Sequence, residues 1–292
     1  MALALCSCLT ACAGQTPAEN PPAGNFEFTF DNYPKMGGSL AALPLGEAVT
    51  AAVLGINRLE ASERIIFEGS TSSNYLGLAD GRFDILLAYE PSAEAIQYAE
   101  EIGFSWEMAP IGRDALVFIA NRENPVDNLK DKDIRGIYTG TIKNWSEVGG
   151  ESAAIIPYQR NKDSGSQTLF DKLINLGAGL LEAPSEQIIG SMIGLLEVVA
   201  QYDNSVDALG YTVYYYLANM EKEKLENTKI LAIDGIVCSN DTIRSGQYPY
   251  VNDFYVVIKA GLPDDDPAKV LFNWICSDQG RELIERENYV AL

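Results

Sequence analysis

A short run of small and hydroxyl-bearing residues follows an arginine in the middle of the chain. Arg160 precedes Ser164-Gly165-Ser166, and apolar residues then recur at helical spacing from Leu169 to Ile174. The first turn of a helix leaves backbone N–H groups unpaired at the positive end of its dipole, and hydroxyls add further donors. An arginine beside them can make a two-point contact with a phosphate or carboxylate. The pattern therefore predicts an anion site.

Two other loops have the same character. Gly37-Gly38-Ser39 precedes a helical face that runs from Leu45 to Ile56, and Gly69-Ser70-Thr71-Ser72-Ser73 follows the strand-like segment Arg64–Phe67. In open α/β sheets, ligands bind beyond the carboxyl ends of the strands. We expect these loops to converge on one site there.

The composition excludes several classes of function. The chain has no histidine, which removes Ser-His-Asp and Cys-His catalysis and His-ligated metal sites. A hydrolase with Ser164 or Ser166 as nucleophile would need a lysine base, and Lys162 is the only one nearby. The net charge of −20 argues against nucleic acid, although a small anion in a buried site is compatible with it. We expect a binding protein without cofactor or metal.

The N-terminal segment is similar to the end of a bacterial lipoprotein signal. An apolar run, Ala2–Leu9, leads to Leu9-Thr10-Ala11-Cys12, and a proline-rich stretch follows. Cys12 would become the lipidated N-terminus, and residues 13–24 would form a tether. Cys238 and Cys276 would then be the cysteines of the folded body, whether paired or free.

Apolar strand-like runs alternate with amphipathic helices along the rest of the chain, which indicates an α/β protein with largely buried sheets. Phe26, Phe28 and Phe30 alternate with polar residues as in a strand. The other expected strands are Phe83–Ala88, Ala115–Ala120, Ile155–Tyr158, Lys229–Ile233 and Tyr255–Ile258.

Long motifs are spaced along the chain after the tether. They are Ile137-Tyr-Thr-Gly-Thr-Ile-Lys-Asn-Trp-Ser-Glu-Val-Gly-Gly150, Asp207-Ala-Leu-Gly-Tyr211, Ile233-Asp-Gly-Ile236, Thr242-Ile-Arg-Ser-Gly-Gln-Tyr-Pro249, Phe272-Asn-Trp274, Gly280 and Tyr289-Val290. Together they resemble the phosphate-binding proteins of bacterial ABC uptake systems, within the type II periplasmic-binding-protein fold. The resemblance covers nearly all of the chain after the tether.

The resemblance implies two α/β lobes, joined by two crossover strands, that close on a ligand in the cleft between them. The first lobe would comprise residues 25–120 and 248–292, and the second lobe residues 121–247. The implied protein is a monomeric, extracytoplasmic, lipid-anchored solute-binding protein. It would capture phosphate or a related oxyanion and deliver it to an ABC permease.

The resemblance also assigns ligand-binding residues. Arg160, Ser164, Gly165 and Ser166 match the second-lobe residues that hold the phosphate. Ser72 matches a first-lobe serine, with Thr71 and Ser73 as close alternatives. At the first helix entrance the family usually has Gly-Ser-Thr, whereas this chain has Gly38-Ser39-Leu40-Ala41, so the N–H groups of Leu40 and Ala41 would replace a hydroxyl.

A second departure concerns specificity. The family typically has an aspartate after the strand Phe83–Ala88, where it accepts a hydrogen from protonated phosphate and so rejects sulfate. This chain has Tyr89 at that position and Glu90 next to it. Either Glu90 takes over the role or Tyr89 contacts a different ligand. Leu40 and Tyr89 therefore leave open a carboxylate, a phosphorylated metabolite or a sugar.

Overall fold

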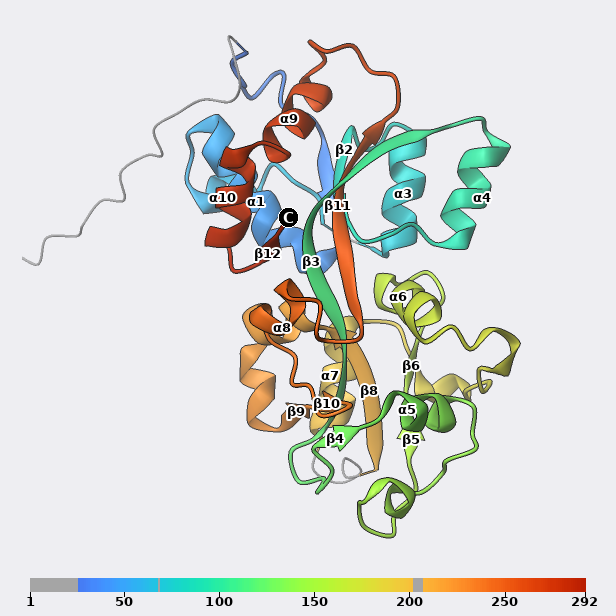
Figure 1. The fold of residues 1–292 in the computed structure, drawn as a ribbon. Coiled ribbons are helices and arrows are strands. Elements are labelled where there is room, and N and C mark those ends of the chain that lie inside the picture. The colour runs from blue at the N-terminus through green and yellow to red at the C-terminus, as the bar shows by residue number, and fades with distance from the viewer. Residues whose placement is uncertain (1–25, 68, 202–206) are drawn as a thin grey trace, which may run out of the picture.

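A computed structural model describes residues 26–67, 69–201 and 207–292 of the chain, and Cys12 lies outside these ranges. The described part has two α/β lobes, one above the other in Figure 1, linked by long strands. Helices pack on both faces of the strands. The expected two-lobed α/β fold is confirmed.

The first lobe is built from both ends of the described chain. Helices α3 and α4 cover one face of its sheet, and α1, α9 and α10 lie on the other (Figure 1). Its elements are β1 (Met36–Gly38), the 3-10 turn η1 (Leu40–Ala42), α1 (Leu43–Leu54), α2 (Arg58–Ser62), α3 (Thr71–Ala79), β2 (Ile85–Ala88), α4 (Ala93–Glu101), most of β3 (Trp106–Asn121), β11 (Val251–Lys259), α9 (Pro267–Ile275), α10 (Asp278–Arg286) and β12 (Val290–Ala291).

The second lobe comes from the middle of the chain. Its strand β8 pairs with β3 on one side and with β5 on the other. Its elements are β4 (Asn128–Leu129), α5 (Asp131–Tyr138), η2 (Trp145–Val148), β5 (Ile156–Pro157), β6 (Gln159–Arg160), α6 (Gly165–Ile174), η3 (Gly177–Gly179), η4 (Ser185–Gln187), β7 (Ile188–Ile189), α7 (Met192–Ala200), β8 (Ala208–Val213), the π-helix η5 (Tyr216–Met220), η6 (Lys222–Glu226), β9 (Thr228–Ile230), β10 (Ala232–Ile233) and α8 (Asn240–Arg244).

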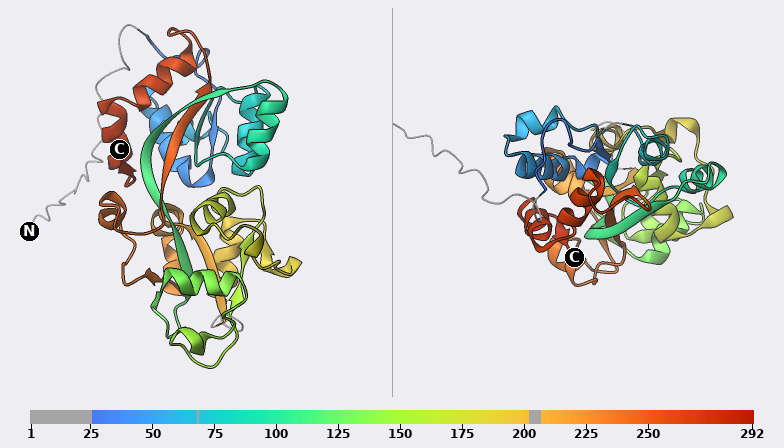
Figure 2. Two further views of the ribbon diagram at one scale, coloured as in Figure 1. Left: turned by 45° about the vertical axis from the view of Figure 1, so that its right-hand side comes forward. Right: turned by 90° about the horizontal axis from the view of Figure 1, so that it is seen from above.

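Two strands run from one lobe to the other (Figure 2). The path through the sheet is β1-β2-β11-β3-β8-β5. Along β3, the residues up to Ala115 pair with β11, and those from Leu116 onward pair with β8. The exchange of partners therefore lies at Ala115 and Leu116, next to Val251 at the start of β11. The lobe boundaries expected at Ala120 and Tyr248 remain a prediction.

An aromatic cluster in the second lobe positions the segment that carries Arg160. The rings of Phe170 and Tyr211 stack with centroids 4.6 Å apart, and Phe118 packs against both. The Tyr211 hydroxyl accepts a hydrogen bond of 3.0 Å from the backbone N–H of Arg160 and donates to the side chain of Gln167 in α6. The core thereby fixes β6 relative to the first turn of α6.

The structure corrects one expectation about the strands. Residues 26–29 are irregular and a turn follows, so the alternating phenylalanines do not form a strand. Phe28 is buried, whereas Phe30 is exposed with the guanidinium of Arg64 over its ring. The first strand is instead β1, which contains the glycines of the first predicted loop. Alternation predicted a half-buried strand, but these side chains pack without a neighbouring strand to pair with.

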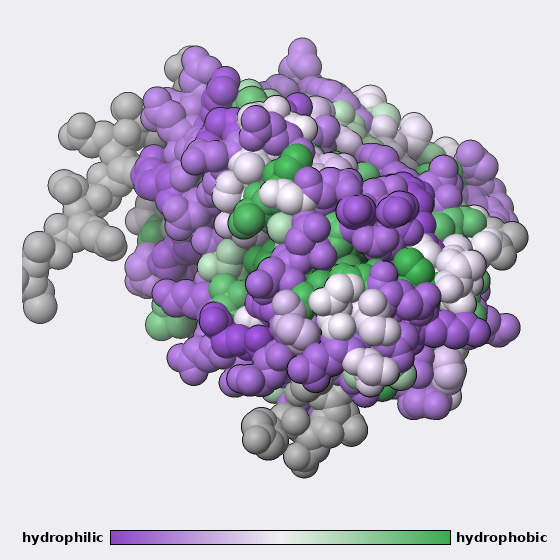
Figure 3. Space-filling model, turned by 60° about the horizontal axis from the view of Figure 1, so that its bottom comes forward, coloured by the Kyte–Doolittle hydropathy of each residue, from purple (hydrophilic) through white to green (hydrophobic). Residues whose placement is uncertain are grey.

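Cys238 and Cys276 are both free, the first buried and the second exposed. Within the described ranges, no helix is long and apolar enough to cross a membrane, and no cluster of acidic or cysteine residues could hold a metal ion. The face shown in Figure 3 is mainly hydrophilic, with a smaller hydrophobic area near its centre. This surface accords with the large net charge.

Candidate functional site

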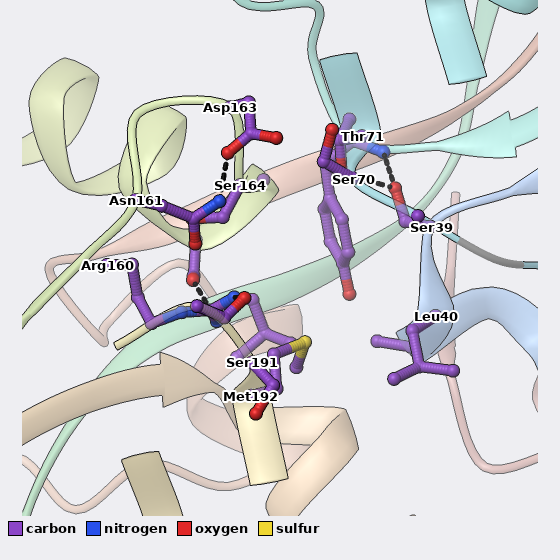
Figure 4. Close-up of a pocket in the computed structure, with 17 residues that line it drawn as sticks. Ser39, Leu40, Ser70, Thr71, Arg160, Asn161, Asp163, Ser164, Ser191 and Met192 are labelled. Carbon is purple, nitrogen blue, oxygen red and sulfur yellow. Dashed lines mark hydrogen bonds between the residues drawn. The ribbon is translucent and has the colours of Figure 1, made fainter. Parts of the chain in front are cut away.

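A cavity of about 330 Å³ lies between the two lobes (Figure 4). From the first lobe it is lined by Ser39, Leu40, Ala41, Gly69, Ser70, Thr71 and Tyr89, and from the second by Arg160, Asn161, Asp163, Ser164, Gly165, Ser166, Gly190, Ser191, Met192 and Val213. The structure thus brings together the ligand-binding residues expected from the sequence, except Ser72, its alternative Ser73, and Glu90.

Arg160 is the buried cation of this cavity. Its side chain is held by three hydrogen bonds: Nη1 donates to Ser166 Oγ (3.0 Å), Nε to the Ile189 carbonyl (2.8 Å) and Nη2 to the Gly190 carbonyl (3.2 Å). The residue is only 6% exposed. The short pairing of β6 with β7 brings these carbonyls to the guanidinium. Arg160 is therefore rigidly placed before any ligand arrives.

The positive charge of Arg160 has no carboxylate partner among the described residues. Burial lowers the pKa of the guanidinium, and the nearby Tyr211, Asp163 and Tyr216 offset this only in part. Arginine remains charged even so, because its ordinary pKa is far above neutrality. A buried charge is costly unless it is paired. An anion in the cavity would supply the missing partner.

Three helices begin at the cavity wall. The N-caps of α3, α6 and α7 are Ser70, Ser164 and Ser191, and all three serines line the cavity. Each cap hydroxyl accepts a hydrogen bond from the N–H of the third helical residue, at 3.1 to 3.2 Å. The positive ends of three helix dipoles thus meet where Arg160 lies. Helix N-termini of this kind favour a negatively charged group, and two of the three, together with Arg160, belong to the second lobe.

Ser191 and the start of α7 are parts of the site that the sequence analysis missed. The signal was present, because Gly190-Ser191 precedes the apolar helix Met192–Ala200 just as Gly38-Ser39 precedes the first helix. Gly190 also supplies the carbonyl that accepts from Arg160. Gly69, Asn161 and Asp163 are further lining residues that were not assigned to the ligand.

The first-lobe wall presents hydroxyls and backbone rather than charge. The hydroxyls of Ser39 and Thr71 are 3.0 Å apart, and Ser39 Oγ accepts from the Tyr89 N–H at 3.3 Å. Leu40 and Ala41 begin the turn η1, whose N-cap is Ser39. In Figure 4 the hydroxyls of Ser39, Ser70 and Thr71 lie close together opposite Arg160 and Ser164.

The lobes touch across the cleft. A Cβ atom on Gly165 would come within 2.4 Å of Thr71 Oγ1, which no side chain could tolerate without a shift. The Ser72 N–H donates to the Asp163 carbonyl at 3.3 Å, and Lys172 forms an ion pair with Glu90. These contacts join α3 to the start of α6 and the residue before its N-cap, and they join the segment after β2 to the last turn of α6. The arrangement is that of a closed cleft.

Two predicted residues are placed away from the cavity. Ser72 is buried and donates its hydroxyl to Ser92 Oγ at 2.6 Å, so Thr71, the expected alternative, occupies the wall instead. Glu90 accepts from Lys172 and, at 3.1 Å, from the Tyr255 hydroxyl. Neither is among the lining residues that the structure describes. Of the two residues that the sequence analysis linked to ligand specificity, Tyr89 lines the cavity and Glu90 does not.

The serines are poorly arranged for nucleophilic catalysis. Ser164 Oγ caps α6, and Ser166 Oγ accepts from Arg160, so each hydroxyl oxygen already holds a donor. No lysine is among the lining residues within the described ranges. A serine nucleophile needs an adjacent base to take its proton. The geometry favours binding over hydrolysis.

Comparison with known proteins agrees with this architecture. Residues 37–279 match the family model described as a PBP superfamily domain. The phosphate-binding protein PstS of Borreliella burgdorferi is 23% identical over 259 residues, which cover 88% of this chain and 89% of that protein. PstS of Bacillus subtilis is 30% identical over 138 residues, covering 46% and 42%.

Solved structures share the fold at low sequence identity. A putative phosphate ABC transporter substrate-binding protein from Clostridium perfringens, solved with bound phosphate, has a TM-score of 0.67 and 20% identity, covering 89% of this chain and all of that one. An ABC-type phosphate transport receptor from Vibrio cholerae has a TM-score of 0.63 and 20% identity, covering 88% and 98%. The chain belongs to the PBP superfamily, as a divergent relative of bacterial phosphate-binding proteins.

Proposed function

We propose that this protein is an extracytoplasmic solute-binding protein that holds phosphate, or a related oxyanion, between its lobes and delivers it to an ABC permease. The observation that carries the proposal is the buried charge of Arg160, which lacks a carboxylate partner within the described ranges and lies where three helices begin. The names of the relatives support phosphate as the first ligand to test.

The proposed mechanism is closure of the cleft driven by binding. An oxyanion would first meet Arg160 and the N-termini of α6 and α7, and the hydroxyls and N–H groups of the first lobe would complete its hydrogen-bond shell as the lobes close. Ligand affinity for the closed form stabilises that form. The division into residues 25–120 with 248–292 and residues 121–247 describes the two moving parts. No chemical step is needed.

Anchoring through Cys12 is part of the proposal. A lipid on that residue would hold the monomeric protein at the outer face of the cell membrane, and the proline-containing stretch after it would act as a spacer. Such a tether leaves the lobes free to close.

The direct test is calorimetric titration of the folded body with phosphate, sulfate and a panel of organic anions. Phosphate is expected to bind with a one-to-one stoichiometry and to raise the melting temperature. Failure of every oxyanion to bind would refute the proposal.

The cavity wall also favours a second candidate, an organic phosphate or carboxylate. Leu40 from the first lobe and Met192 and Val213 from the second give the cavity an apolar side, and its volume is at the lower end of the range for small organic ligands. The same titration separates the two candidates. Tighter binding of a phosphomonoester than of inorganic phosphate would favour the second.

A further inference from the structure

Tyr89 is one of the residues that line the cavity, and none of the described residues donates a hydrogen bond to its phenolic oxygen. It follows β2 and is only 4% exposed. Its backbone N–H donates to Ser39 Oγ at 3.3 Å, and its carbonyl accepts from the Tyr75 hydroxyl at 2.9 Å. The main-chain groups of Tyr89 are therefore already bonded. The phenolic oxygen is the polar atom of its side chain, and it is the atom through which that side chain could contact a ligand.

The hydrogen of that phenol is taken by a buried aspartate. Tyr89 donates to Asp114 Oδ2 at 2.6 Å. Asp114 Oδ1 accepts from the backbone N–H groups of Ala115 (2.7 Å) and Tyr215 (3.0 Å). Asp114 is 1% exposed and is not among the described lining residues of the cavity. All of its partners are donors, so the carboxyl group acts as an acceptor toward each of them.

The protonation states agree with this geometry. Burial raises the pKa of Asp114 to about 6, and its hydrogen bonds act in the opposite direction, so the carboxyl group is ionised at neutral pH. Burial, together with the nearby Asp114, raises the pKa of Tyr89 well above its usual value, so the phenol keeps its proton. With that hydrogen directed at Asp114, the oxygen of Tyr89 has only lone pairs left.

We infer that Tyr89 contacts the bound oxyanion purely as a hydrogen-bond acceptor, and that Asp114 is the positioning residue that holds it in this role. The inference rests on the proposed function and adds a specificity to it: the site selects an oxyanion that carries a hydrogen. Phosphate at neutral pH has such a hydrogen and sulfate has none. An acceptor that faces an oxygen without hydrogen loses its hydrogen bond and meets like charge, which is the basis of discrimination.

The test measures the ratio of the sulfate and phosphate dissociation constants by calorimetry at pH 7.5. In the parent protein the ratio is expected to favour phosphate. Tyr89→Phe keeps the ring that packs against Phe254 but removes the oxygen, so the ratio should fall by about tenfold or more. Asp114→Asn offers an N–H₂ group to the phenol, which frees the phenolic hydrogen to point at the ligand. This variant should lower the ratio as well.

Two controls separate specificity from structural damage. Tyr98→Phe removes a tyrosine–aspartate hydrogen bond of the same 2.6 Å length, to Asp80, outside the cavity, and it should leave the ratio unchanged. The double variant Tyr89→Phe with Asp114→Asn should have the ratio of Tyr89→Phe alone, because Asp114 acts through the phenol. Thermal melting identifies any variant that fails to fold. If Asp114→Asn does not fold, the result for Tyr89→Phe alone decides the question.

The outcomes distinguish this inference from the proposed function. If the parent protein binds phosphate and Tyr89→Phe keeps the parent ratio, Tyr89 does not accept the ligand's hydrogen and the inference is overturned. Asp163, the acidic residue among the described lining residues, would then be the next candidate for that role. A parent protein that binds both anions equally also overturns it. A parent protein that binds neither anion refutes the proposed function itself.

Discussion

The two walls of the cavity are built from similar turns but differ in charge. Among the described lining residues, the second-lobe wall holds the cation Arg160 and the first turns of α6 and α7, whereas the first-lobe wall holds the first turn of α3, the hydroxyls of Ser39 and Thr71, and Tyr89. A cation with two helix dipoles attracts an anion at a distance more strongly than one helix dipole with neutral hydroxyls. The difference suggests that the second lobe supplies most of the affinity and the first lobe supplies closure and selectivity.

Removing the charge of the second-lobe wall should have the largest effect. Arg160→Gln is expected to weaken oxyanion binding by at least about 2 kcal/mol, or roughly thirtyfold, because a buried charge-assisted contact is lost. Calorimetric titration with phosphate measures it. Arg122→Gln is the matched control, since Arg122 also donates to a backbone carbonyl, that of Leu225, but is exposed. Equal affinity in both variants would remove Arg160 from the site.

Preventing contact between the walls should have the next largest effect. Gly165→Ala places a methyl group within 2.4 Å of Thr71 Oγ1, so the closed cleft can form only with a displacement. Overpacking of this kind typically costs about 1–3 kcal/mol, and phosphate affinity should fall accordingly. Combined with Gly165→Ala, the change Thr71→Ala removes the oxygen that the new methyl group would meet, so it should restore part of the phosphate affinity. Combined in the same way, Thr71→Ser keeps that oxygen and serves as the control. No recovery in the Gly165→Ala, Thr71→Ala double variant would contradict the steric explanation.

The ion pair at the cleft mouth should matter less. Lys172 and Glu90 are partly exposed, with side chains 49% and 25% accessible, and such pairs contribute about 1 kcal/mol or less. Glu90→Gln removes the ion pair and loosens closure, so it should weaken phosphate binding by less than about fivefold. The effect should be smaller at high salt, because salt already screens the ion pair in the parent protein. The sulfate-to-phosphate ratio should not change. A changed ratio of the sulfate and phosphate dissociation constants would indicate that Glu90 accepts the ligand's hydrogen after all.

The smallest effect on binding should come from the segment outside both walls. Cys12→Ser is expected to move the protein from the membrane fraction to the soluble fraction and to leave phosphate affinity unaltered, because the lipid is the anchor and the tether is separate from the cavity. Fractionation followed by titration measures both properties. Persistent membrane association of this variant would point to another means of attachment.

Local sequence patterns predicted the residues of the second-lobe wall better than those of the first-lobe wall. The Ser164-Gly165-Ser166 turn, the helix after it and Arg160 are close together in sequence, so their spacing carried the prediction. Ser191 had the same Gly-Ser signature but was overlooked. The contact of Asp114 with the cavity-lining Tyr89 could not have been found this way, because the fold alone brings Tyr89 and the backbone of Tyr215 to this lone aspartate in an apolar strand. The strand expected at residues 26–30 failed for a related reason, since alternation does not guarantee a pairing partner.

The order of strands in the first lobe determines when its sheet can form during synthesis. Strand β11 lies between β2 and β3, so the middle of that sheet is synthesised after both of its neighbours and after the segments of the second lobe. The second lobe comes from the middle of the chain and can gather its strands and aromatic cluster as it emerges. A nascent chain that lacks Val251–Lys259 cannot join β2 to β3 through β11. Until β11 is made, the facing edges of β2 and β3 would be unpaired strand edges of the kind that a chaperone or a protease can recognise.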